Sequence, residues 1–226
     1  MEITKLSLPG ENDYYVQNAY KVLRTNLQFC GQDIKVIGLT SCNENEGKTT
    51  IALHVAKSFS ELDKKVLIID ADMHKSVIAG RNTTVHHPVG LSEVLTGMEK
   101  LADCIYGTQY PRLHILFAGQ YPPNPLELLN GKYFTALLEA TKQCYDYIII
   151  DTPPLGAVID AAVIAKNCDG MILVIGDSKI RYSQAQNIVN QLKKSDCKIL
   201  GVVRNNAEVP NSTYYYKKKY QKYSKR

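Results

Sequence analysis

Apolar residues in this chain gather in short continuous runs that alternate with stretches of helical spacing. The runs are typical of strands covered on both faces of a sheet, and they span residues 34–40, 65–70, 113–117, 147–151, 171–175 and 198–203. Before and between them, apolar positions recur three or four residues apart, which predicts helices over residues 16–29, 48–61, 132–145, 159–166 and 182–194. Strands that alternate with helices in this way indicate an α/β fold.

The expected architecture is an open, mainly parallel β-sheet with helices on both faces. Residues 74–112 are less regular, and we expect shorter helices there, one of them starting at a Ser92 cap. The 226 residues suffice for one large domain with a substantial core. We place this domain at residues 1–206 and a C-terminal tail at residues 207–226.

The tail differs in composition from the rest of the chain. Its last 13 residues contain six basic residues and no acid, so we expect a disordered, solvated segment. The same stretch holds five tyrosines, Tyr214, Tyr215, Tyr216, Tyr220 and Tyr223. The formal net charge of the chain is +5. Without the six basic tail residues, 21 basic and 22 acidic residues remain, so the body offers no basic face for nucleic acid.

Cysteine usage and hydropathy indicate the compartment. The six cysteines are scattered and form no C-x-x-C pair, which favours free thiols in a reducing cytoplasm over a disulfide framework or a zinc site. No apolar run approaches the roughly 20 residues that a membrane span needs. We therefore expect a cytoplasmic protein that reaches the membrane only through a partner.

A phosphate-binding loop is predicted between the first strand and the next helix. Gly47, Lys48 and Thr49 match the end of the P-loop pattern, although Cys42 replaces its first glycine. In such a loop Lys48 reaches the β- and γ-phosphates and the hydroxyl of Thr49 binds Mg²⁺. The residues expected to contact the nucleotide here are Asn45, Glu46, Gly47, Lys48, Thr49 and Thr50.

Three carboxylates follow buried strands at the same expected edge of the sheet. Asp70 and Asp72 end one run of apolar residues and Asp151 ends another. Carboxyl ends of parallel strands are where open α/β sheets bind ligands, and a carboxylate that ends a buried run needs a cation or a partner. Beside a P-loop, the three acids indicate a Mg²⁺ and nucleophile site.

Together these segments resemble the bacterial tyrosine kinases, within the wider class of MinD/ParA-like P-loop ATPases. The similarity includes residues 67–75 (LIIDADMHK), 90–97 (GLSEVLTG), 118–129 (AGQYPPNPLELL) and 145–154 (YDYIIIDTPP), and it extends from about Ala19 to the tail. The aspartate segments fit the whole class. The proline-rich segment and the tyrosine tail favour the kinase branch.

The resemblance implies a role for each acid and cofactors of ATP and Mg²⁺. Lys48 and Thr49 correspond to Walker A contacts, Asp70 and Asp72 to the Walker A′ acids, and Asp151 to the Walker B acid. Lys48, Asp70 and Asp72 are the implied catalytic residues, and Thr49, Asp70, Asp72 and Asp151 the implied metal ligands. Asn205, with Arg204 beside it, resembles the position that contacts the base.

Two departures bear on assembly and class. The second lysine of MinD/ParA loops falls at Asn43, as expected for a kinase. Many relatives carry E-x-x-R-x-x-R in the first helix for ring assembly, whereas this chain has Asn18, Lys21 and Arg24, so loss of the glutamate weakens the case for a ring. Lys21 and Arg24 could still pair with acids of a neighbour.

The tail admits three uses: a basic membrane anchor, a nucleic-acid contact, or a substrate phosphorylated in trans by a neighbouring subunit. We favour the substrate interpretation. The resemblance further implies a transmembrane chain-length regulator of capsule or exopolysaccharide assembly as activator, a cognate tyrosine phosphatase, and recruitment to the inner face of the membrane. The alternatives are a MinD/ParA-like switch ATPase that dimerises with nucleotide, and a nucleotide-binding relic without turnover.

Overall fold

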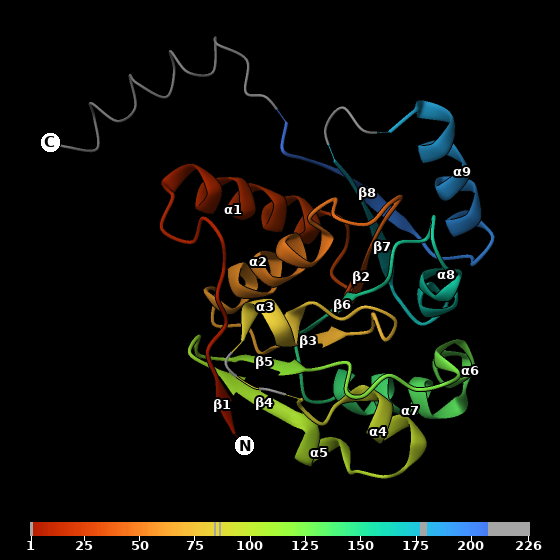
Figure 1. The fold of residues 1–226 in the computed structure, drawn as a ribbon. Helices are drawn as coiled ribbons and strands as arrows, with labels where there is room; N and C mark the ends of the chain where they lie inside the picture. Colours follow the sequence, from red (N-terminus) through yellow and green to blue (C-terminus); the bar gives the residue numbers. More distant parts are fainter. Residues whose placement is uncertain (1, 84, 86, 177–179, 208–226) are drawn as a thin grey trace, which may run out of the picture.

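The computed structural model describes residues 2–83, 85, 87–176 and 180–207 (Figure 1). Its centre is an eight-stranded sheet with strand order β1-β4-β5-β3-β6-β2-β7-β8. The strands are β1 (Ile3–Thr4), β2 (Val36–Ser41), β3 (Val66–Asp70), β4 (Ile105–Thr108), β5 (Leu113–Leu116), β6 (Tyr147–Asp151), β7 (Gly170–Gly176) and β8 (Ile199–Asn205). All neighbouring strands are parallel except β4 and β5.

Helices connect the parallel strands. In the described part of the chain they are α1 (Tyr14–Phe29), α2 (Lys48–Ser60), α3 (Ile78–Asn82), α4 (Leu91–Thr96), α5 (Leu101–Cys104), α6 (Pro125–Asn130), α7 (Lys132–Lys142), α8 (Asp160–Ala165) and α9 (Tyr182–Lys193). Figure 1 shows α1 and α2 on one side of the sheet and α4, α7 and α8 on the other. The predicted fold class is confirmed.

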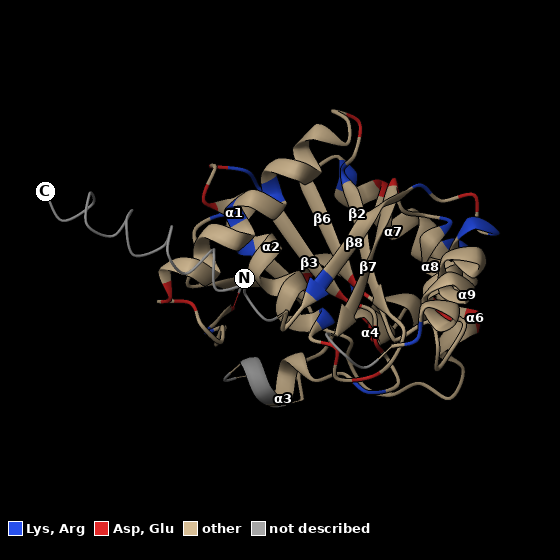
Figure 2. Ribbon diagram, turned by 90° about the horizontal axis from the view of Figure 1, so that it is seen from above, with Lys and Arg blue, Asp and Glu red and all other residues tan. Residues whose placement is uncertain are grey.

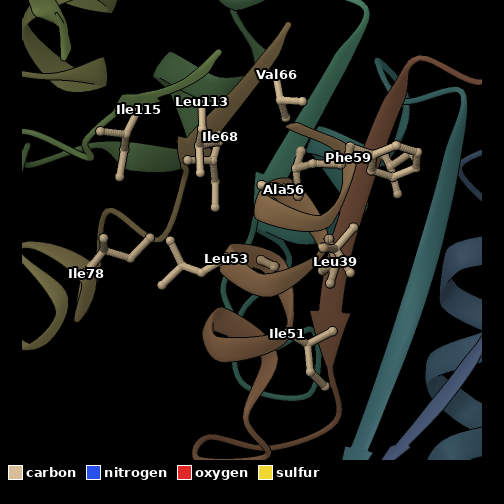
Figure 3. Close-up of a cluster of buried hydrophobic side chains, with 14 of the residues drawn as sticks. Leu39, Ile51, Leu53, Ala56, Phe59, Val66, Ile68, Ile78, Leu113 and Ile115 are labelled. Atoms are coloured by element: carbon tan, nitrogen blue, oxygen red, sulfur yellow. The ribbon is translucent and has the colours of Figure 1, made fainter. Parts of the chain in front are cut away.

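The side chains of each central strand alternate between two hydrophobic layers, because successive residues of a strand point to opposite faces. Val66 and Ile68 of β3 pack with α2 in one cluster, and Leu67 and Ile69 pack in the other cluster with α4 and α7. Figure 3 shows side chains of α2, among them Phe59, in the cluster that contains Val66 and Ile68. Both faces of β3 are therefore dry, which explains its continuous apolar sequence.

The two central strands end in register. Asp70, the last residue of β3, lies opposite Asp151, the last residue of β6. β2, which ends at Ser41 and leads into the P-loop, is the other neighbour of β6. The topology therefore gathers the P-loop and both acids at one edge of the sheet, here called the carboxyl edge.

The irregular region between residues 74 and 112 contains the main differences from the sequence analysis. β4 was not predicted, and it runs antiparallel to β5. The expected Ser92 cap is wrong, because α4 begins at Leu91 with Gly90 as its N-cap. Ser92 instead lies inside the helix, and its backbone N–H donates to the carbonyl of Ala118 at 3.0 Å.

Charge and hydropathy of the described residues agree with an ordinary globular surface. Figure 2 shows lysine and arginine interspersed with aspartate and glutamate around the ribbon. Within residues 2–207, apart from the undescribed positions, no helix is both long and apolar enough to cross a bilayer. All six cysteines lie in described positions and are free thiols. The tail from residue 208 onward, with its five tyrosines, lies outside the described residues, so the domain boundary stays a prediction.

Candidate active site

The P-loop connects β2 to α2 through two residues with left-handed backbone. Asn45 has φ of 61° and Gly47 has φ of 85°, and such conformations turn backbone N–H groups toward a common centre. A side chain on Gly47 would also collide with the amide of Asn205. α2 begins at Lys48 and is 13 residues long, so its free N-terminal N–H groups and dipole favour an anion in front of Lys48, Thr49 and Thr50.

Glu46 is turned into the loop. Its side chain is 3% exposed, and Oε2 accepts the backbone N–H groups of Cys42 at 2.9 Å and Asn43 at 3.0 Å. These two bonds fix the start of the loop, where Cys42 stands in place of the usual glycine. Glu46 thus supports the shape of the loop with its side chain.

Lys48 forms a buried ion pair with Asp151. Its Nζ lies 2.6 Å from Oδ1 of Asp151, and the two side chains are 7% and 1% exposed. Removal of one member of such a pair leaves an uncompensated buried charge. The predicted P-loop lysine and the predicted Walker B acid are therefore in direct contact.

Asp70 is the most strongly perturbed acid of the site. Burial, reinforced by the neighbouring charge of Asp151, raises the pKa of Asp70 to about 7. Ser76 opposes this shift by donating a 2.5 Å hydrogen bond to Oδ2. A carboxylate that is buried beside a second carboxylate attracts a cation or a proton, which is the property that a metal-binding acid or a general base needs.

Asp72 lies on the loop that follows β3. Burial also raises the pKa of Asp72, while the charge of Lys48 and the backbone N–H of Lys75 act in the opposite direction. Lys75 in turn reaches across to the P-loop, with Nζ 2.6 Å from Oε2 of Glu44. This exposed pair joins the loop after β2 to the loop after β3.

The acids suit a metal that keeps water and phosphate ligands. Among the residues that the structure describes, no group of three or more His, Cys, Asp or Glu side chains is arranged to hold a metal by itself. Mg²⁺ ordinarily binds one or two carboxylates and completes its shell with water and substrate phosphates. Asp70, Asp72, Asp151 and Thr49 gather at the carboxyl edge, where burial and the neighbouring charge of Asp151 raise the pKa of Asp70.

Asn205 lies at the same edge but contacts the loop. It is the last residue of β8, two residues beyond the apolar run that predicted this strand. Its Nδ2 donates to the carbonyl of Glu46 at 2.9 Å. Arg204 precedes it on the exposed edge strand β8. Asn205 therefore ties the end of the sheet to the P-loop.

The structure adds residues that the sequence analysis did not single out. Ser76 donates to Asp70, as described above. His74 pairs with Asp160 at 2.6 Å, and the Asp160 side chain is only 4% exposed. An acid at the start of the small apolar helix α8 was a usable signal, but its partner lies 86 residues earlier, too far for pattern reasoning.

On α1, Arg24 is held within its own chain. Its Nη1 donates to the carbonyl of Ser58 at 2.5 Å and to the Ser58 hydroxyl at 3.2 Å. Lys21 and Asn18 are exposed. Pairing of Arg24 with a neighbouring subunit would require these bonds to α2 to rearrange.

Comparisons with known proteins agree with this site. A family model described as an AAA domain matches residues 34–200. Tyrosine-protein kinase CpsD of Streptococcus agalactiae serotype III (strain NEM316) is 40% identical over 195 residues, which make up 86% of this chain and 84% of the relative. The kinase domain of Escherichia coli tyrosine kinase ETK has a TM-score of 0.79 at 30% identity, over 88% of this chain and 80% of that one.

The wider class is also represented. The septum site-determining protein MinD of Pyrococcus horikoshii OT3, in complex with Mg-ADP, has a TM-score of 0.62 at 26% identity, over 79% of this chain and 75% of that one. The ETK kinase domain has both the higher TM-score and the higher sequence identity. With 40% identity over most of both chains and the P-loop and strand-end acids together at one edge, this chain belongs to the bacterial tyrosine-protein kinase family.

Proposed function

We propose that this kinase transfers the γ-phosphoryl group of ATP to tyrosines in the C-terminal tail of a second copy of the chain. The observation that supports this most directly is the cluster at the carboxyl edge, where Lys48 contacts Asp151 and Asp151 lies in register with Asp70. The chain carries its own candidate acceptors, Tyr214, Tyr215, Tyr216, Tyr220 and Tyr223.

The P-loop binds the nucleotide phosphates in this proposal. Backbone N–H groups at the start of α2 receive the phosphate oxygens, as at other helix N-termini. Lys48 leaves Asp151 and pairs with the β- and γ-phosphates, because a phosphate offers more negative charge than one carboxylate. Asn45 and Gly47 contribute the loop's turns, and Arg204 and Asn205 would contact the base.

Thr49, Asp70, Asp72 and Asp151 are the residues that would hold Mg²⁺. When bound, this ion neutralises charge on the β- and γ-phosphates. Release of Asp151 from Lys48 makes its carboxylate available for this purpose. The protein thus exchanges a lysine–carboxylate pair for a lysine–phosphate pair.

Asp70 steers the tyrosine hydroxyl. The pKa of Asp70 is raised to about 7, close to physiological pH, which is favourable for a group that accepts a proton there. A phenol has an unperturbed pKa near 10, and in a loose transition state most of the catalysis comes from orientation and charge neutralisation. Asp70, held by the hydrogen bond from Ser76, therefore orients the hydroxyl and accepts its proton late.

Phosphorylation would regulate the protein by changing the charge of the tail. Each added phosphate contributes about −1.5 to −2 charge at pH 7, so a few phosphates reverse the sign of the tail. We infer, by analogy with the family, that a transmembrane polysaccharide chain-length regulator activates the kinase at the inner face of the membrane. By the same analogy, a cognate tyrosine phosphatase resets the tail, and the pathway served is capsule or exopolysaccharide export.

The test is incubation of the pure full chain with ATP and Mg²⁺, alone and with the cytoplasmic segment of a candidate membrane activator. Mass spectrometry is expected to find phosphotyrosine between Tyr214 and Tyr223, and Lys48→Met must remove it. Mixing the Lys48→Met chain with active kinase tests the trans reaction, because only the inactive chain's tail then reports transfer between copies. ATP hydrolysis without any phosphotyrosine would instead identify a switch ATPase of the MinD kind.

A further inference from the structure

The segment after β5 holds an exposed tyrosine on a rigid support. Tyr121 is 66% exposed, whereas Pro122, the next residue, is buried. On the other side, Gln120 donates its backbone N–H to Oε1 of Glu93 at 3.0 Å. A large aromatic ring kept in water on a fixed backbone is typical of a binding contact, because little conformational entropy is lost when a partner covers it.

The support is built by two segments that the sequence analysis noted without a role. Gly119 has φ of 81°, and a side chain there would collide with Glu93 and Ser92 of α4. A side chain on Gly90 would collide with the backbone of Phe117. Close contacts at Gly90 and Gly119 thus pack residues 90–97 against residues 118–129, and this packing positions Tyr121.

Tyr121 stands at the carboxyl edge. β5 is parallel to β3, with Leu116 opposite Ile69, so the chain leaves β5 at the same edge where β3 ends in Asp70. The ring of Tyr121 lies 6.2 Å from the ring of His74. His74 is two residues beyond Asp72 and is anchored by its 2.6 Å contact with Asp160.

We propose that the exposed ring of Tyr121, backed by His74, is the subsite that receives the acceptor-tyrosine segment of a second copy's C-terminal tail. This inference rests on the proposed function and adds the surface that selects the substrate. The ring of an acceptor tyrosine packs against the ring of Tyr121, either stacked or edge to face. Its hydroxyl then points past His74 to the acids of the carboxyl edge. Because the contact is with a ring, it tolerates any of the five tail tyrosines.

Charge supports the same occupant. The described residues of the carboxyl edge include more carboxylates than basic side chains: Glu44, Glu46, Asp70, Asp72, Asp151 and Asp160 against Lys48, Lys75, Arg181 and Arg204. The tail offers tyrosines directly beside Lys217, Lys218 and Lys219. A basic segment is therefore attracted to this edge. The strand that precedes the tail also ends at this edge, since Asn205, the last residue of β8, contacts the P-loop.

The binding test uses full-length chains in which all five tail tyrosines are alanine, so that the protein's own tail does not compete. The probe is a fluorescent synthetic peptide of residues 207–226, titrated by anisotropy with Mg²⁺ and a non-hydrolysable ATP analogue present. Tyr121→Ala is expected to weaken peptide binding about tenfold, and Tyr121→Phe to restore it. Binding of the ATP analogue, measured separately, is expected to stay unchanged in both variants.

The matched control is Tyr133→Ala. Tyr133 is 60% exposed on α7, where the Lys132 ammonium lies 5.4 Å from the centre of its ring, so its loss is expected to leave peptide affinity unchanged. Equal binding by Tyr121→Ala and the parent, equal weakening by Tyr133→Ala, or no peptide binding by the parent up to about 1 mM each overturns the subsite.

Failure of the subsite and failure of the kinase reaction are distinguishable. If the wild-type chain forms tail phosphotyrosine while Tyr121→Ala binds peptide normally, the reaction stands and the subsite is wrong. If peptide binding depends on Tyr121 but no phosphotyrosine forms with ATP and activator, the docking surface stands and the proposed reaction is wrong.

Discussion

The interior of β3 and β6 and the last residues of the same strands are built in opposite ways. Inside, Ile68 and Ile149 are fully buried among apolar side chains. Two residues later in each strand, Asp70 and Asp151 are also buried, yet they place two carboxylates side by side. The interior stabilises the fold, whereas the strand ends hold charge that the fold alone does not neutralise well.

This difference shows where stability and function separate along one strand. Apolar burial contributes roughly 25 cal/mol per Å², and its loss is felt by the whole domain. Burial of a charge opposes folding unless a partner compensates it. Charge compensation at the carboxyl edge is partial, since Lys48 forms an ion pair with Asp151 while the pKa of Asp70 stays raised. We expect substitutions in the strand interiors and at the strand ends to change the free energy of unfolding by different amounts and, at Asp70, in the opposite direction.

The largest effect is expected from Lys48→Met. It removes the phosphate contact, so transfer should fall at least about 10³-fold, and it leaves Asp151 unpaired, which should cost about 3 kcal/mol of unfolding free energy. Radiolabel transfer and urea unfolding measure the two losses. Lys57→Met on the same helix is the control, because Lys57 pairs with partly exposed Glu61 and should cost below about 1 kcal/mol.

Ile68→Ala should reduce stability without changing chemistry. Truncation of a fully buried isoleucine costs about 2–5 kcal/mol, and Ile68 faces α2 and not the site. The midpoint of urea unfolding should fall, while kcat per folded molecule, measured well below the unfolding temperature, should stay near the wild-type value. A large drop in kcat with intact fold would show that the two regions are not separable.

Asp70→Asn should have the opposite sign in stability. Between the unfolded pKa of 3.8 and the folded pKa of about 7, the folded state binds more protons than the unfolded chain, so wild-type stability falls as pH rises from about 4 to about 7. Asparagine has no charge to bury. The variant should therefore be inactive yet melt at least about 2 °C higher at pH 8, and this difference should shrink steadily toward pH 5.

Calorimetry of the nucleotide-free proteins between pH 5 and pH 8 checks this prediction. The control is Asp63→Asn, because the Asp63 side chain is 82% exposed beside Arg112 and should give no pH-dependent gain. A lower melting temperature for Asp70→Asn at pH 8 would falsify the view that the site is held against the preference of the fold.

The smallest effect is expected at His54, inside the apolar layer. His54 is buried on α2, stacks on Tyr20 at 4.3 Å and contacts the Pro9 carbonyl. Burial lowers its pKa below 6.5, so the unfolded chain binds more protons and stability should decline as pH falls below 6.5. His54→Gln should flatten this decline in thermal melts, whereas substitution of exposed His87 to glutamine should leave it unchanged.

The sequence by itself determined the parts whose signal is local. A continuous apolar run followed by an acid identified β3 with Asp70 and β6 with Asp151, because a strand covered on both faces admits few polar residues before its end. The P-loop was equally local, since Gly47, Lys48 and Thr49 follow one strand and begin one helix. The parallel topology then required these segments to meet at one edge.

Only the tertiary structure decided contacts between distant segments. Gly90 caps α4 because the backbone of Phe117 lies against it, which no local preference for serine could reveal. The pairs Lys48–Asp151 and His74–Asp160 and the setting of Tyr121 likewise join residues that are far apart in sequence. Side-chain partners depend on how the layers pack, and that packing is a property of the whole fold.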